Sequence, residues 1–368
     1  YSLCGPNDIK SNLKLSACYT FSGLKKISVD KLEAGDIIAI AGIENIKIGD
    51  TISDNENPKP LPRIKIDEPT VSMFFHVNNS PFAGREGKYL TSRNISERLF
   101  KETLSNVSLK VNNTDESDVF EVCGRGELQM AILIETMRRE GYEFMVSKPK
   151  VITKEENGIT MEPVEHVYLD LEEDHVGTIT EKLSIRKGKM INLQNNGFGR
   201  VMLEFKIPSR GMIGFRSQFL TDTKGSGILN ALFDSYAPWF GNIPQRNTGV
   251  IIADRTGKVT PYASLAMVDR GELFVDVGLD VYKGMIVGER NRTGDLDVNI
   301  VREKKMSNVR SSTKDNTVVL RPPKKLSLDQ CIEFIAQDEL IEITPQNLRI
   351  RKMELDINKR IAFNKRNK

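Results

Sequence analysis

Few residues in this sequence have the types and spacing that catalysis needs. Hydrolysis of GTP or ATP requires a glycine-rich turn that holds the phosphates, followed by a lysine and a serine or threonine, in the pattern GxxxxGK[ST]. The glycine clusters GFGR (197–200) and KGSG (224–227) lack the lysine–hydroxyl pair. We therefore interpret both as turns, and we expect this chain to be inactive alone as a nucleotide hydrolase, with no catalytic or cofactor-binding residue.

The histidines and cysteines give no pattern typical of a metal site. The cysteines are scattered without a CxxC pair, and the three histidines do not lie at ligand spacing from them. They are Cys4, Cys18, Cys123, Cys331, His76, His166 and His175. We expect reduced, buried cysteines in a cytoplasmic protein and no bound metal.

One acidic run next to a histidine could bind a cation or transfer a proton. Glu172, Glu173 and Asp174 precede His175. Negative charge also suits the first turn of a helix, where it interacts favourably with the helix dipole. We favour this second interpretation, and no GxSxG motif suggests a nucleophile elsewhere.

Basic residues are concentrated in two segments near the C-terminal end. Residues 302–325 and 349–368 each carry a net charge of +6, which leaves −9 for the remainder of a chain whose total is +3. Phosphate contacts dominate nucleic-acid affinity, so this distribution favours an RNA partner. The alternative is that both segments are merely solvated. The candidate RNA-binding residues are Arg302, Lys304, Lys305, Asn308, Arg310, Lys314, Arg321, Lys324, Lys325, Arg349, Arg351 and Lys352.

The first of these segments looks like a loop. REKKMSNVRSSTKDN (302–316) mixes basic residues with Ser, Thr and Asn and has no aromatic side chain on which a base could stack. We therefore expect contact with the backbone and shape of structured RNA rather than base-specific reading of a single strand.

The elements that would position these residues predict a multidomain α+β protein. Short β-branched runs with Gly-Asp turns predict a partial β-barrel over 1–66. Residues 67–148 show the order strand, helix, strand, strand, helix, strand, which is the ferredoxin-like (split βαβ) arrangement, and the order recurs over 149–238. Residues 239–368 predict a mostly β domain with one late helix at LSLDQCIEFIA (326–336).

Four helices of the two repeats follow from apolar spacing and end signals. We expect them at 91–104 with Thr91 or Ser92 as N-cap, at 127–141 ending at Gly141, at 174–188 beginning at Asp174, and at 210–227.

Composition is that of a folded protein, with 39% apolar and 28% charged residues. No run approaches the roughly 18 apolar residues that span a bilayer, so we expect no membrane partner. Residue 1 is Tyr rather than Met, from which we expect the natural N-terminus to lie upstream.

Several motifs resemble known translation factors. GRGELQMAILIETMRREG (124–141) resembles a helix of domain III of elongation factor G, and IPSRGMIGFRSQFLTDTKGSG (207–227) resembles its domain V. With DEPTVSMFFHVNNSPFAGREGKYLTSR, LDVNIVREKKMSNVRSS and ELIEITPQNLRIRK, the sequence is similar to the BipA/TypA family from about residue 14 almost to the end. Elongation factor G inserts a further domain after SKPKV (147–151), which is absent here.

This resemblance implies a translational GTPase that binds the ribosome at the factor site and acts in ribosome assembly and in translation under stress or cold. It implies a C-terminal domain directed toward rRNA, ribosomal proteins and the acceptor end of tRNA, with GTP and Mg²⁺ bound by a GTPase domain that the 368 residues do not include. By analogy, the loop around Lys304, Lys305, Asn308 and Arg310 is the best candidate for RNA contact. We expect a monomer.

Two other classes of function stay open at this point. One is a translation factor of the elongation factor 4 (LepA) type, or an RNA-binding module without a GTPase partner domain. The other is an enzyme whose cleft gathers perturbed acids or bases between the domains. A C-terminal domain unlike that of the BipA/TypA family would favour the LepA type.

Overall fold

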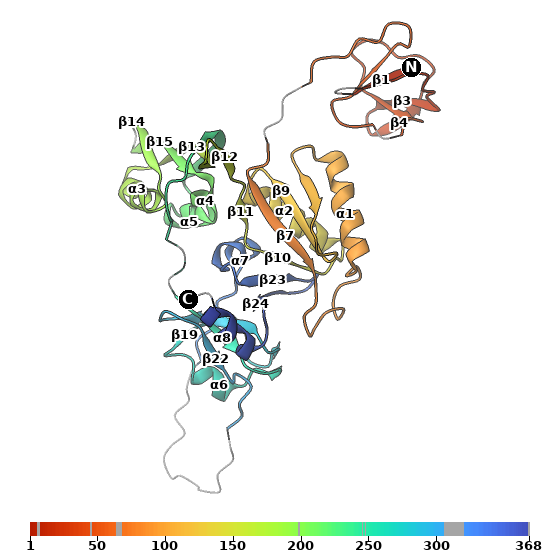
Figure 1. The fold of residues 1–368 in the computed structure, drawn as a ribbon. Helices are drawn as coiled ribbons and strands as arrows, with labels where there is room; N and C mark the ends of the chain where they lie inside the picture. Colours follow the sequence, from red (N-terminus) through yellow and green to blue (C-terminus); the bar gives the residue numbers. More distant parts are fainter. Residues whose placement is uncertain are drawn as a thin grey trace, which may run out of the picture. The chain divides into compact units, whose positions relative to one another are not determined.

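The structure is a computed structural model that describes residues 1–5, 8–44, 46–63, 68–197, 199–244, 246, 248–304 and 320–366 (Figure 1). It divides into two compact units. The first comprises Tyr1–Asp67 with Phe100–Ser108, and the second comprises Glu68–Leu99 with Leu109–Lys368. The whole is a mixed α+β protein with several sheets, as the sequence predicts.

The N-terminal unit contains two small antiparallel sheets. One has the order β2-β1-β6 and the other β4-β3-β5. Their strands are β1 (Ser2–Cys4), β2 (Ile9–Lys10), β3 (Ala17–Ser22), β4 (Lys25–Ser28), β5 (Ile38–Ala41) and β6 (Thr51–Ser53). The strands predicted for a partial barrel are therefore present, but they do not form a closed barrel within the described residues.

The first predicted repeat has the ferredoxin-like order. Its elements are β7 (Val71–Val77), α1 (Ser92–Ser105), β8 (Lys110–Asn113), β9 (Val119–Gly124), α2 (Glu127–Arg139) and β10 (Phe144–Ser147). The strands lie in the order β10-β7-β9-β8 and all their pairs are antiparallel. A short strand, β11 (Lys150–Val151), also pairs with β7.

Both helices of this repeat show features that the sequence predicts: an N-cap residue for α1, and an apolar face and a terminal glycine for α2. The Oγ1 atom of Thr91 accepts the backbone N–H of Asn94 (3.3 Å), which satisfies a free donor in the first turn of α1. Helix α2 buries Met130, Ile134 and Met137 completely, on one face. Gly141, which follows the C-cap residue Glu140 of α2, has a left-handed φ of +93°.

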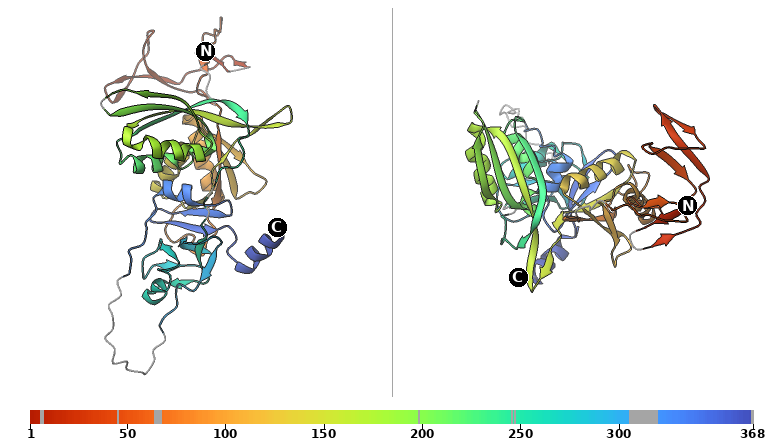
Figure 2. Two further views of the ribbon diagram at one scale, coloured as in Figure 1. Left: turned by 90° about the vertical axis from the view of Figure 1, so that its left-hand side faces the viewer. Right: turned by 90° about the horizontal axis from the view of Figure 1, so that it is seen from above.

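The second repeat has the same strand order. Its elements are β13 (Ile159–Glu172), η1 (Glu173–His175), α3 (Val176–Ile185), β14 (Lys189–Asn195), β15 (Arg200–Pro208), α4 (Ser209–Met212), α5 (Phe215–Asp222) and β16 (Ile228–Pro238), preceded by the short strand β12 (Lys154–Glu156). The sheet runs β16-β13-β15-β14. Figure 2 shows that the helices of this repeat, in green, lie on one face of its sheet.

Two expected helices of the second repeat differ from the prediction. The helix expected at 210–227 is divided into α4 and α5, because Gly214 adopts a left-handed φ of +76° that no continuous helix permits. The helix expected to begin at Asp174 starts with the 3₁₀ turn η1, and Asp174 makes no capping hydrogen bond. The repeated order requires a strand at the position of β14, but no segment was assigned to it, because apolar alternation there is weak; all residues of β14 are exposed.

The C-terminal region is more helical than the expected single late helix. It contains β17 (Val250–Ala253), β18 (Gly257–Lys258), α6 (Pro261–Leu265), β19 (Gly271–Leu273), β20 (Asp280–Val281), β21 (Met285–Arg290), β22 (Leu296–Val298), α7 (Leu328–Phe334), β23 (Glu339–Ile343), β24 (Leu348–Lys352) and α8 (Ile357–Arg366). Helix α7 is the predicted one. Helix α6 was not expected in this mostly β region; it forms because the side chain of Thr260 accepts the N–H of Ala263 and Pro261 occupies the first turn.

A single sheet connects the first repeat to the C-terminal region. Strand β10 pairs with β7 on one side and with β23 on the other, so the order continues as β22-β17-β21-β24-β23-β10-β7-β9-β8. One apolar core, which includes Phe144, Val146, Ile332, Ile341 and Ile343, packs beneath this junction. No described helix is long and apolar enough to cross a membrane.

Candidate nucleic-acid interface

The predicted RNA-binding residues of the first basic segment lie at its two described ends. The side chains of Arg302, Lys304, Arg321, Lys324 and Lys325 are all exposed. Lys305, Asn308, Arg310 and Lys314 lie outside the described residues. The structure therefore shows five accessible cations of this segment.

Both ends are anchored to neighbouring elements of the C-terminal region. The guanidinium of Arg302 lies 5.7 Å from the ring centre of Tyr262 on α6, and the backbone N–H of Lys324 donates to the carbonyl of Leu273 on β19 (2.8 Å). Lys325 forms an exposed ion pair with Asp276 (3.4 Å). Exposed ion pairs contribute little to stability, so these cations can exchange their partners for phosphate at small cost.

The second basic segment has a different structural role. Arg351 and Lys352 on β24 are each 2% exposed, and Arg349 is half-buried. Arg349 forms ion pairs with Glu86 and with Glu342. Burial thus removes Arg351 and Lys352 from the side chains that RNA can reach in this conformation.

Lys352 is held in a cluster of carboxylates. Its Nζ lies 2.7 Å from Asp295, 2.8 Å from Asp338 and 2.9 Å from Glu339. Burial alone would lower the pKa of Lys352, but the three carboxylates raise it above its ordinary value. The lysine is therefore charged at all physiological pH values and binds three surrounding segments together.

A second buried network fixes the loop that follows β7. The carboxylate of Glu143 accepts the backbone N–H groups of Gly84 and Gly87 (both 2.8 Å), while the hydroxyl of Tyr282 donates to Glu342 (2.6 Å). The side-chain amide of Asn78 donates to both carboxylates, at 2.7 and 3.0 Å. The NNSPFAGREGK segment (78–88) is thus positioned by buried acids of β23 and of the residue preceding β10.

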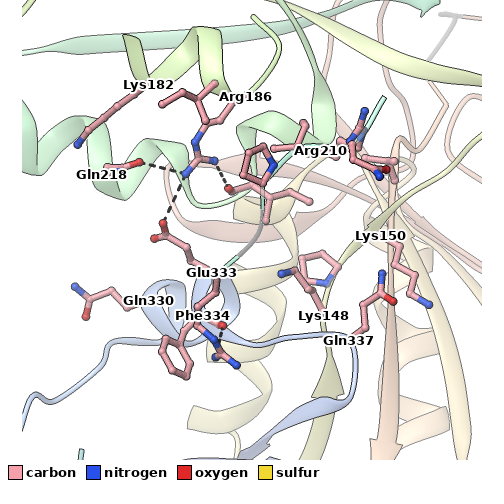
Figure 3. A pocket seen from close by; sticks show the side chains of 18 of the residues that line it. Lys148, Lys150, Lys182, Arg186, Arg210, Gln218, Gln330, Glu333, Phe334 and Gln337 are labelled. Atoms are coloured by element: carbon pink, nitrogen blue, oxygen red, sulfur yellow. Dashed lines mark hydrogen bonds and ion pairs between the residues drawn. The ribbon is translucent and has the colours of Figure 1, made fainter. Parts of the chain in front are cut away.

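A large cleft lies among α3, α5, α7 and the segment joining β10 to β11 (Figure 3). The sequence did not predict this cleft. Its volume is about 1160 Å³. Among the described residues, seven basic side chains and one acidic side chain line it. The basic residues are Lys148, Lys150, Lys182, Arg186, Arg210, Arg246 and Lys324, and the acid is Glu333. They come from segments far apart in the sequence, and only the pair of lysines in SKPKV gives any local signal.

Several cations of this cleft are fixed by carboxylates behind them. Arg210 forms a two-point ion pair with the fully buried Glu162 (2.5 and 3.0 Å), and its guanidinium lies 3.8 Å from the ring centre of Trp239. Arg246 pairs in the same manner with Glu339 (2.8 and 3.2 Å). Such two-point pairs hold the planar guanidinium in one orientation.

No group of histidine, cysteine and acidic residues in the described part of the chain could hold a metal ion. The acidic run before His175 forms the η1 turn, and His175 lies 4.0 Å from Glu172. All four cysteines are free, and Cys4, Cys123 and Cys331 are buried, whereas Cys18 is half-buried.

Comparison with known families gives the class of protein. The family described as "Elongation factor G C-terminus" matches residues 159–247, and the family described as "TypA/BipA C-terminal domain" matches residues 248–357. Together with the two ferredoxin-like sheets, these adjoining matches define a translation-factor architecture. The second match also decides against the LepA alternative, which requires a different C-terminal domain.

Relatives that match almost the whole chain identify the family. "Large ribosomal subunit assembly factor BipA" of Bacillus subtilis (strain 168) is 47% identical over 97% of this chain and 58% of its own length. The proteins of the same name from Salmonella typhimurium and Haemophilus influenzae are 49% and 50% identical, over 96% and 93% of this chain and 58% and 56% of their own lengths. This chain belongs to the BipA/TypA family, and it spans somewhat more than half the length of these relatives.

A weaker structural similarity is found with a solved protein of Thermus thermophilus. The TM-score is 0.40 and the sequence identity 15%, over 65% of this chain and 51% of that chain.

Proposed function

We propose that this chain is the ribosome-docking part of a translational GTPase that acts in assembly of the large ribosomal subunit and in translation under stress or cold. The observation that carries the proposal is identity of 47–49% over 96–97% of the chain to relatives named as large-subunit assembly factors. The protein would act in the cytoplasm as a monomer, with the ribosome as its partner.

Docking at the factor site would direct the C-terminal region toward rRNA and the acceptor end of tRNA. The exposed cations at the ends of the 302–325 segment support this orientation. Their ion pairs, such as that of Lys325 with Asp276, are exposed and weak, so these cations are free to bind phosphate instead. The RNA-contacting set is then Arg302, Lys304, Arg321, Lys324 and Lys325, with Lys305, Asn308, Arg310 and Lys314 proposed on sequence grounds. Arg349, Arg351 and Lys352 would support the domain from within.

GTP and Mg²⁺ do not fit the residues of this chain. It contains no GxxxxGK[ST] turn, and no described cluster of acids could hold a metal ion. We therefore assign no step of GTP hydrolysis to these residues. Their proposed contribution is to bind and orient the factor on the ribosome.

Co-sedimentation with separated ribosomal subunits at low and raised salt tests this proposal. The informative variant replaces Lys304, Arg321 and Lys325 with Glu. The matched control replaces Lys10, Lys25 and Lys26 with Glu, and these three lysines are exposed in the N-terminal unit. Both variants change the net charge equally. We expect salt-sensitive binding to large subunits that is weakened in the first variant and retained in the control.

Two results would contradict the proposal. Absence of binding to either subunit at any salt concentration would show that these residues do not dock on the ribosome. Equal losses in both variants would show that only net charge matters, and that the 302–325 segment is not the contact.

A further inference from the structure

We propose that the cleft among α3, α5, α7 and the β10–β11 segment binds the phosphate backbone of RNA through Lys148 and Lys150. The inference rests on the proposed function, because it takes ribosomal RNA as the ligand. It assigns a second RNA-binding surface, whose proposed contacts Lys148 and Lys150 lie outside the 302–325 segment, although Lys324 of that segment also lines the cleft.

Among the described residues, the two lysines differ from the other cations of the cleft because no carboxylate forms an ion pair with them. Arg186, Arg210 and Arg246 each form an ion pair with an acidic side chain, and so does Lys182 with Asp222 (2.7 Å). Within the described residues, neither Lys148 nor Lys150 makes an ion pair, and the Nζ of Lys150 lies 6.0 Å from the ring centre of Phe74. Two lysines without an ion pair therefore line a cleft that is already basic.

Lys148 occupies an electrostatically unfavourable position in the absence of a ligand. It is half-buried, and burial lowers the pKa of Lys148, with Arg246 lowering it further, against the opposite effects of Glu339 and Glu333. A phosphate beside its amino group would reverse these effects, because a nearby negative charge favours the charged form of a lysine. The charged form of Lys148 is thus more stable beside a bound anion than without one.

The shape of the cleft favours an extended polyanion over a small one. Its volume of about 1160 Å³ exceeds the roughly 300–1,000 Å³ of ordinary small-molecule pockets. Its basic groups are distributed over β10–β11, α3 and the start of α4 rather than converging on one point, as Figure 3 shows for Lys148, Lys150, Arg186 and Arg210. Several phosphates along one strand would meet these groups in succession.

Neutral groups in the cleft complete a surface suited to RNA. The side-chain amides of Gln330, Gln337 and Asn242 can bond to phosphate oxygens or 2′-hydroxyl groups. Trp239, the only tryptophan of the chain, lines the cleft and is 43% exposed. Its ring carries the Arg210 guanidinium on one side and can stack with an unpaired base through its exposed part.

The test is the salt dependence of binding to large-subunit rRNA, measured by filter binding with the full 368-residue chain. The variant is Lys148→Gln with Lys150→Gln, and the matched control is Lys25→Gln with Lys26→Gln, two exposed lysines on β4. Loss of two phosphate contacts lowers the slope of log affinity against log salt by about 1.4, from ~0.7 per contact for single strands. We expect this decrease in the cleft variant only.

Protection from acylation provides a measurement that needs no substitution. We expect rRNA to protect Lys148 and Lys150 of the unsubstituted chain from a lysine-acylating reagent, while inorganic tripolyphosphate at equal phosphate concentration protects them much less. Equal or greater protection by tripolyphosphate would overturn the RNA assignment in favour of a small oligophosphate. No protection by either would overturn the site.

The failure of this inference can be distinguished from failure of the proposed function. If the chain does not sediment with ribosomal subunits, the proposed function is wrong and this inference, which rests on it, fails as well. If the chain does sediment, but the cleft variant keeps the full salt slope for rRNA, the proposed function stands and only the cleft assignment is wrong.

Discussion

Val146 of β10 lies directly opposite Ile341 of β23 in an antiparallel pair that joins the first ferredoxin-like sheet to the C-terminal region. Both side chains are completely buried in one core. The two strands come from parts of the chain nearly 200 residues apart in sequence. The C-terminal region is therefore not attached through a linker alone, but shares a sheet and a core with the first repeat.

Replacing Ile341 with Ala tests this shared core. Removal of buried methyl groups leaves a cavity, and we expect the free energy of unfolding to fall by about 2–5 kcal/mol. Ile361→Ala on α8, where the side chain is 48% exposed, serves as the control and should change stability by less than about 0.5 kcal/mol. Urea denaturation measures both, and equal small effects would contradict a tightly packed junction.

The buried lysine of β24 gives a second prediction, which separates support from RNA binding. Lys352→Met leaves Asp295 and Asp338 without this cation and leaves the buried Glu339 paired with Arg246 alone. Breaking a buried ion pair in this manner costs about 3–5 kcal/mol of stability. We expect the folded fraction of this variant to bind rRNA with unchanged affinity, as measured by filter binding under conditions where the protein stays folded.

The converse result is expected for Lys324→Met with Lys325→Met. Both side chains are exposed and their ion pairs are long, at 3.6 and 3.4 Å, so stability should change by less than about 1 kcal/mol. Their rRNA affinity should nevertheless fall, with a smaller salt slope. If instead Lys352→Met reduces affinity and this double variant does not, the assignment of the two basic segments is reversed.

Much of the fold followed from local patterns in the sequence. The helices α1 and α2 have apolar residues at four-residue spacing and recognisable end signals at Thr91 and Gly141, and the structure confirms both. The repeat of this order predicted the second ferredoxin-like unit. Where the local signal was weak, as in the fully exposed β14, or depended on a single glycine, as at Gly214, the prediction was incomplete or wrong.

The site could be predicted only in part, because composition does not distinguish a buried cation from an exposed one. Lys324 and Lys352 look alike in the sequence, yet the first is exposed and the second is 2% exposed among carboxylates. The basic cleft was missed because Lys148, Arg186 and Arg246 come from three distant segments. Their proximity depends on tertiary packing, for which no local pattern exists.

The carboxyl group of Glu127 predicts a pH dependence of stability. Glu127 begins α2, and it accepts the backbone N–H of Gly214 through Oε2 (2.7 Å). Burial raises the pKa of Glu127 to about 7, with Asp329 and Glu333 also raising it, while the Gly214 hydrogen bond and Arg186 lower it.

The sign of this effect follows from proton linkage. The folded state binds this proton more tightly than the unfolded state, so the contribution is complete below about pH 4.5 and is lost as pH rises through about 7. Glu127→Gln keeps an oxygen acceptor for Gly214 and removes the titration. We expect stability of the unsubstituted chain, relative to this variant, to fall between pH 5 and pH 7 in urea denaturation. Burial also raises the pKa of Glu165 to about 7, so the variant itself retains some pH dependence. A constant stability difference between the two proteins across this pH range would contradict the role of Glu127.

Gly214 itself provides a prediction with an internal control. Its φ is +76°, and a Cβ atom at this position would overlap Cγ of Glu333 on α7, whereas at Gly225 φ is +82° and no atom lies within 4 Å of the added Cβ. A left-handed conformation costs an alanine about 1–2 kcal/mol relative to glycine. Gly225→Ala should therefore lose only about this amount, and Gly214→Ala should lose more, because Glu333 and helix α7 must also move. Urea denaturation of the two variants compares them directly, and an equal loss in both would show that α5 and α7 do not pack closely at this point.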